Sequence, residues 1–185
     1  DLSRPQDAFV FGNLSNLYAD PEGVAFFVRN LSKNYEGVPP ILQRFGTISF
    51  HGEVSGYFTD IVTYGLVHTD IGSIKTDLKI SSDKEKGYFA YSGAVKTEEL
   101  ELGNMLDNEK LGKVTFNLDV EGSHYDNQYP SIVMKGLIAS IDYSDYNYEN
   151  ITLDGKYKQG GFNGKVALDD ENGSILLNGN INTVS

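Results

Sequence analysis

The sequence predicts a mainly β fold: an antiparallel meander of about ten strands curled into a groove, with one amphipathic helix near the N-terminus. Short runs of alternating apolar and polar residues recur through most of the chain, which is typical of strands with one buried face. Clusters of Gly, Asn and Asp separate these runs and favour tight turns. Glycine also occurs repeatedly within the runs, on their apolar side.

Glycine follows a repeated pattern, with an apolar residue two positions before it and another two positions after it. Because side chains alternate between the two faces of a strand, all three residues share one face. The pattern recurs in Phe50–Val54, Tyr91–Val95, Met134–Ile138, Leu153–Tyr157, Phe162–Val166 and Leu177–Ile181. A glycine within a strand loses packing contacts and costs conformational entropy on folding. Its repetition therefore indicates that the geometry of the backbone requires it. It predicts either a sheet that coils sharply around a trough, or bulges and strand ends in an ordinary β-sandwich.

The composition indicates a single β-rich domain over residues 1–185. Hydrophobic residues make up 39% of the chain and aromatic residues 12%, which is enough for a core. The net charge of −11 argues against nucleic-acid binding, and the absence of Cys excludes disulfides and thiolate metal sites. No apolar run approaches the roughly 20 residues of a membrane helix. The abrupt start of the sequence leads us to expect a fragment of a longer protein, with its targeting segment elsewhere.

The first predicted strand, Ala8–Ala19, leads into the strongest helix signal of the chain. Asp20 is a favourable N-cap residue, and Pro21 suits the first helical position. We expect the helix to cover Asp20–Glu36. Its apolar residues recur at helical spacing and predict a face that docks on the protein's own sheet, the alternative being a membrane or partner role: Val24, Phe27, Val28, Leu31 and Tyr35.

Strands dominate from Ile48 onward. Ile74–Ile80 and Phe89–Tyr91 alternate on either side of the turn Asp83–Gly87, which predicts a hairpin. Asn104–Leu111 is either one helical turn or a connector. In a later strand we expect one face to consist of Val133, Leu137, Ala139, Ile141 and Tyr143, with Met134 and Ile138 on the other.

The sequence contains no recognisable catalytic or nucleotide-binding motif. His51, His68 and His124 lie far apart and are typical of surface imidazoles. Two acidic groups offer oxygen ligands for Ca²⁺: Asp142 with Asp145, or Asp169, Asp170 and Glu171. They lack EF-hand spacing, and such clusters are what turns use anyway. A hydrolase built on two carboxylates stays open, because such partners meet only in the fold. We therefore expect a non-enzymatic protein with no catalytic residue, metal or cofactor.

A known family shares the repeat style of four stretches: Gly46–Gly56, His68–Ile80, Tyr91–Gly122 and Tyr146–Asp170. Together they resemble the large AsmA-like proteins, specifically the TamB (translocation and assembly module) proteins of the Bacteroidota. The resemblance implies a β-taco, a long sheet curled into an apolar groove, in a periplasmic protein anchored in the inner membrane by a segment absent from this sequence. It further implies movement of phospholipid toward the outer membrane or assembly of outer-membrane proteins. The implied partners are phospholipid acyl chains and an outer-membrane barrel assembly protein.

The apolar strand faces supply the candidate lining of a lipid groove. Acyl chains require apolar walls and no polar anchor at fixed spacing, and each buried CH₂ contributes about 0.8 kcal/mol. The candidate lining residues are Phe50, Val54, Phe89, Tyr91, Val95, Val114, Phe116, Leu118, Val120, Leu153, Tyr157, Phe162, Val166, Leu177 and Ile181. The alternative is a closed β-sandwich, filled by its own side chains, that binds protein or glycan through its loops.

Overall fold

The computed structural model describes residues 8–31, 38, 40–57, 59–83, 85–125 and 129–182, without the side chains of residues 27, 28, 30, 31 and 41. Ten strands form one sheet in which every strand pairs with the next along the chain. They are β1 (Phe9–Ala19), β2 (Ile48–Tyr57), β3 (Asp60–Thr69), β4 (Gly72–Asp83), β5 (Tyr88–Glu101), β6 (Leu111–Tyr125), β7 (Ser131–Tyr143), β8 (Tyr146–Lys158), β9 (Gly161–Asp170) and β10 (Gly173–Asn182).

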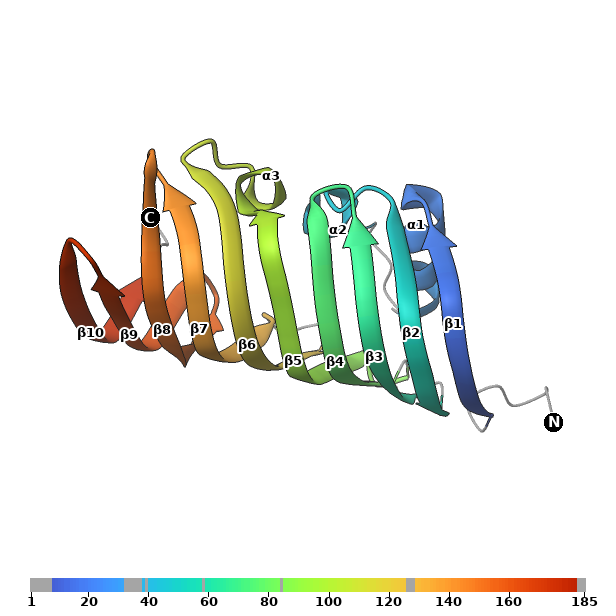
Figure 1. The fold of residues 1–185 in the computed structure, drawn as a ribbon. Helices are drawn as coiled ribbons and strands as arrows, with labels where there is room; N and C mark the ends of the chain where they lie inside the picture. The colour runs from blue at the N-terminus through green and yellow to red at the C-terminus, as the bar shows by residue number, and fades with distance from the viewer. Residues whose placement is uncertain are drawn as a thin grey trace.

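The sheet is an open antiparallel meander. Within the described part of the chain, β1 pairs only with β2 and β10 only with β9. Figure 1 shows the strands side by side, each bent along its length, so that the sheet curls. The predicted mainly β meander is therefore confirmed, including the hairpin formed by β4 and β5. These strands form one sheet, and not the two packed sheets of a sandwich.

One face of the sheet, called the inner face below, is apolar from edge to edge. Residues directly opposite each other on neighbouring strands share a face, so the pairing register traces rows across the sheet. One such row crosses all ten strands: Leu17, Phe50, Val67, Ile74, Thr97, Phe116, Ile138, Ile151, Leu168 and Ile175. The alternation in the sequence thus becomes a continuous apolar surface.

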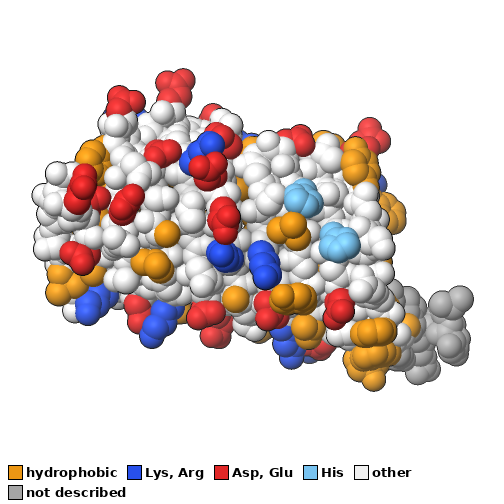
Figure 2. Space-filling model, viewed as in Figure 1, with side chains coloured by type: hydrophobic (Ala, Val, Ile, Leu, Met, Phe, Trp, Pro, Cys, Tyr) orange, Lys and Arg blue, Asp and Glu red, His pale blue; other side chains and the backbone are white. Residues whose placement is uncertain are grey.

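The opposite, outer face is polar. A row on this face contains charges of both signs: Asn13, Glu53, Tyr64, Asp77, Ala94, Asp119, Lys135, Asp154, Lys165 and Asn178. The Nζ of Lys135 lies 3.2 Å from the Oδ2 of Asp154 on the neighbouring strand. Figure 2 shows acidic and basic side chains interspersed on this face. The outer face of the sheet is therefore exposed to water.

Glycine lies on the inner face where neighbouring strands approach too closely for a side chain. Gly155 faces Gly164 across the β8–β9 pair, and a Cβ on Gly164 would lie 2.4 Å from the carbonyl oxygen of Asp154. Gly93 adopts a φ of +139°, and its Cβ would lie 2.0 Å from the carbonyl oxygen of Asp77. Real Cβ atoms do not approach other atoms this closely, so the curled backbone requires glycine at both positions.

A bulge changes the predicted face of β7. Met134 and Ile138 lie on the inner face, whereas Val133 and Leu137 lie on the outer face and are 39% and 40% exposed. The β6–β7 register shifts between Thr115 and Phe116, which returns Ile141 to the inner face. The expected face that combined Val133, Leu137 and Ile141 is therefore wrong. Strict alternation does not reveal a bulge that adds one residue to the strand.

Three short helices accompany the sheet: α1 (Pro21–Leu31), α2 (Pro40–Gln43) and α3 (Leu102–Leu106). The N-cap prediction is confirmed, because the Oδ1 of Asp20 accepts a hydrogen bond from the N–H of Gly23 at 2.8 Å. Figure 1 shows α1 behind β1 and β2. Of the predicted docking face, Val24 is half-buried. The side chains of Phe27, Val28 and Leu31, and all of Tyr35, lie outside the described residues.

Candidate functional site: the apolar inner face

The predicted groove residues lie together on the inner face. The register places every candidate lining residue on this side, from Phe50 on β2 to Ile181 on β10. Several inner-face residues were not among the candidates, although the same alternation marks them: Val67, Ile74, Ile138, Ile151 and Leu168. The sequence therefore predicts which face is apolar. The sequence does not predict which parts of that face remain exposed.

One part of the inner face is covered by the protein itself; we call it the capped region. Here Leu100 is 1% exposed, Val114 3% and Ile71 7%. Partly buried side chains from outside the strands pack on these three residues: Phe45, which follows α2, and Leu102 and Met105 of α3. Val114, a predicted lining residue, thus belongs to the protein's own core and offers no surface to a ligand.

Arg44 joins the two segments that form the cap. Its Nη1 donates a hydrogen bond to the carbonyl oxygen of Met105 at 3.1 Å, and its Nη2 lies 2.9 Å from the Oδ2 of Asp107. Asp107 adopts the left-handed conformation that ends α3, with a φ of 56°. The residue after α2 is thereby tied to the C-terminal end of α3 across the capped region.

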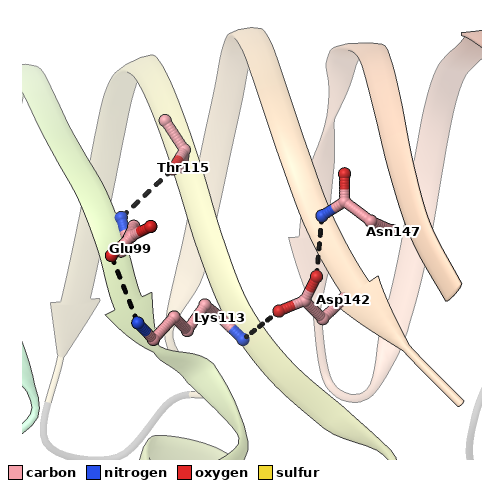
Figure 3. A network of polar contacts seen from close by, with 5 residues as sticks. All are labelled: Glu99, Lys113, Thr115, Asp142 and Asn147. Carbon is pink, nitrogen blue, oxygen red and sulfur yellow. Dashed lines mark hydrogen bonds and ion pairs between the residues drawn. The ribbon is translucent and has the colours of Figure 1, made fainter. Parts of the chain in front are cut away.

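A polar network on the outer face supports the capped region from behind (Figure 3). Lys113 donates from its Nζ to Glu99 and from its backbone N–H to Asp142, both at 3.1 Å. Asn147 donates to the other oxygen of Asp142 at 2.7 Å, and Thr115 accepts the N–H of Glu99. Glu99 has a φ of 53° and lies in the bulge between β5 and β6. These contacts link four successive strands where the register shifts.

The inner face on β8 to β10, which we call the open region, is less covered: its side chains are mostly half-buried on β8 and β9 and exposed on β10. Every residue of β10 is exposed, including the inner-face residues Leu177 and Ile181 at 50% and 48%. A hollow of about 150 Å³ lies along β9 and β10, between Phe162, Val166 and these two residues. The apolar surface therefore continues beyond the capped region.

A second hollow of about 340 Å³ lies at one end of the open region, and a polar group forms its rim. The hydroxyl of Tyr146 donates to the Oδ1 of Asp170 at 2.5 Å, and Asp170 also accepts the N–H groups of Asn172 and Glu149. The hydrogen bond from Tyr146 and that from the Asn172 N–H hold the pKa of Asp170 below its usual value. The same bond to Asp170 raises the pKa of Tyr146.

Potential metal ligands do not cluster among the described residues. Within that part of the chain, no three His, Asp or Glu side chains converge on a possible metal position. His51 and His68 lie on the outer face and bond to the carbonyl oxygen of Ser15 and the hydroxyl of Ser73. His124 differs from the expected surface imidazole, because it lies on the inner face opposite Phe89. The apolar surface is thus the dominant feature of the inner face.

Comparison of the chain with protein-family models, with curated proteins and with solved structures finds no match. None of the helices in the described residues is both long enough and apolar enough to pass through a membrane. The candidate site is therefore defined by its geometry alone: an apolar inner face that is buried around Ile71, Leu100 and Val114 and becomes exposed on β10.

Proposed function

We propose that this chain is a non-enzymatic lipid-binding module whose inner face carries phospholipid acyl chains. The observation that carries the proposal is an apolar face that crosses all ten strands, is mostly half-buried on β8 and β9, and is fully exposed on β10. Monomeric soluble proteins rarely expose a contiguous apolar surface of this kind unless it binds something. Acyl chains fit it, because they need apolar contact and no polar anchor.

The dimensions of the sheet agree with an acyl chain as ligand. Ten strands spaced about 4.8 Å apart extend over roughly 43 Å, whereas one leaflet of a bilayer has a hydrocarbon depth of about 15 Å. An acyl chain could therefore lie entirely on the inner face across several strands. Each CH₂ removed from water there would contribute about 0.8 kcal/mol.

Movement of phospholipid between the inner and outer membranes, or help in outer-membrane protein assembly, is the wider role that we propose. The resemblance of four stretches to TamB-type proteins suggests the periplasm as the compartment. It also suggests an outer-membrane assembly protein as a further partner. The polar outer face fits an aqueous compartment, since it exposes charges of both signs along its length.

Photo-crosslinking tests the proposal. A photoreactive amino acid at Phe162 or Leu177, on the inner face of the open region, should capture phospholipid in cells that produce the protein. The matched control is Leu137, which is exposed to a similar degree but lies on the outer face. Mass spectrometry of the purified adducts would identify the lipid. Equal labelling from Leu137, or no lipid adduct from either inner-face position, would overturn the proposal.

A further inference from the structure

The two edge strands differ in charge from the other strands. β1 and β10 contain no Asp, Glu, Lys or Arg, whereas each strand from β2 to β9 contains at least one. Edge strands normally carry charges, Pro or bulges, because their unpaired backbone groups otherwise recruit other strands. β1 has a bulge between Leu14 and Leu17, but Phe9–Leu14 pairs regularly with β2. Both edges therefore lack the charges that prevent strand addition.

Apolar side chains are most exposed on these same edges. Phe11 on β1 is 74% exposed and Leu176 on β10 is 65% exposed. Both lie on the outer face, where the apolar side chains of the interior strands, such as Val62 and Leu137, are less exposed, at 44% and 40%. Among the described residues, each edge strand thus pairs with a single neighbouring strand and carries uncovered apolar side chains, as expected of surfaces that become buried against another chain.

Glycine at the β1 edge, Gly12, has no steric cause within the described residues. A Cβ on Gly93 or Gly164 would collide with the neighbouring strand, but a Cβ on Gly12 of β1 or Gly179 of β10 would meet no described atom within 4 Å. Glycine weakens a strand, so the presence of Gly12 needs another reason, whereas Gly179 adopts a φ of +159° that itself favours glycine. Both residues belong to the same row of the inner face, which runs from Gly12 through Gly155 and Gly164 to Gly179.

The two edges match each other in direction and register. Because the meander has ten strands, β10 runs opposite to β1. A second copy in the same orientation would therefore place its β1 antiparallel to β10 of the first copy. With Gly12 opposite Gly179, Leu14 would face Leu177 and Val10 would face Ile181. These inner-face rows would continue without interruption from one copy to the next.

We propose that copies of this chain associate head to tail, with β1 of one copy added to β10 of the next. The added strand would satisfy the backbone groups of both edges and bury Phe11 and Leu176. The absence of charge on either edge removes direct like-charge repulsion at the junction, despite the net charge of −11. Such an interface uses two different surfaces and leaves one of each unpaired at the ends, so assembly is open-ended. The proposal holds whether or not the inner face binds lipid.

The test uses one charged substitution on each edge. Leu176→Lys should block the β10 edge and Phe11→Lys the β1 edge, while Leu137→Lys on interior strand β7 is the control. Sedimentation across a concentration series should show growing oligomers for the unchanged chain and the control, and monomers for either edge variant alone. An equal mixture of the two edge variants should give particles of twice the monomer mass and no larger species, because one intact edge of each kind remains. Asn178→Lys and Asn13→Lys repeat the test without removing an apolar side chain.

Three outcomes would overturn the proposal. The first is an unchanged chain that stays monomeric at every concentration, which would assign the edges to another partner. The second is a Phe11→Lys variant that still dimerises, which would indicate β10–β10 pairing. The third is an edge-variant mixture that fails to dimerise although circular dichroism shows both variants folded. None of these outcomes depends on lipid, so they are separate from the test of the proposed function.

Discussion

The capped region and the open region occupy one continuous face but differ in what covers it. In the capped region, Leu100 and Val114 are almost fully buried beneath α3 and Phe45. In the open region, Leu177 and Ile181 lie on the same face and are about half exposed. Both regions have the same alternation of apolar and polar residues. The difference therefore arises from contacts outside the strands and from the number of neighbouring strands.

This difference suggests a division of roles within one sheet. Covered apolar side chains contribute to the stability of the folded chain, since they leave water on folding. Uncovered side chains contribute less to stability and remain able to bind a ligand or another chain. Substitutions in the capped region should therefore affect unfolding, whereas those in the open region should affect binding.

Truncation of a side chain in the capped region should have the largest effect. Leu100→Ala removes a fully buried side chain and should lower the free energy of unfolding by about 2–5 kcal/mol. Leu177→Ala, which makes the same chemical change in the open region, should lower it by about 1 kcal/mol or less. Urea unfolding followed by circular dichroism measures both values. Equal losses would show that the open region is as well covered in solution as the capped one.

Glycine substitution should change the free energy of unfolding differently in the interior of the sheet and at its edge. Gly93→Ala places a Cβ against the carbonyl oxygen of Asp77 at a positive φ, and should lower the free energy of unfolding by about 1–3 kcal/mol. Gly12→Ala, on edge strand β1, meets open space and should leave stability unchanged or raise it by up to about 1 kcal/mol. Both are measured by urea unfolding at a concentration too low for association. A similar loss at both positions would contradict the steric explanation for the interior glycines.

Much of the fold follows from local pattern. Alternation and turn residues predict the meander, and the apolar–glycine–apolar spacing predicts the inner face of runs such as Phe162–Val166 and Leu177–Ile181. These predictions succeed because the direction of a side chain in a strand depends only on its position in the sequence. The helix start at Asp20 was predictable for the same reason, since an N-cap is a local interaction.

The cover over the inner face could not be predicted. Phe45 and Met105 are separated by many residues, and Arg44 brings their segments together through contacts that no sequence pattern marks. The bulges at Glu99 and in β7 also depend on the neighbouring strand. Sequence reasoning therefore identified the apolar face, but it could not distinguish Val114, which is covered, from Leu177, which is not.

The smallest predicted effect concerns the polar rim of the open region. The hydroxyl of Tyr146 holds the pKa of Asp170 below its usual value, so ionised Asp170 favours the folded state. That contribution is present above the unfolded pKa of Asp170, and it is lost as pH falls through the lower folded pKa. Tyr146→Phe removes the donor and should move the pKa of Asp170 upward, toward its usual value. Carboxyl NMR titration measures this shift, with Asp83 as the control because its pKa is lowered by Lys86 on a different hairpin. An unchanged Asp170 pKa in the variant would show that the backbone N–H groups of Asn172 and Glu149 suffice. The rim of the open region would then keep its structure without the Tyr146 hydroxyl.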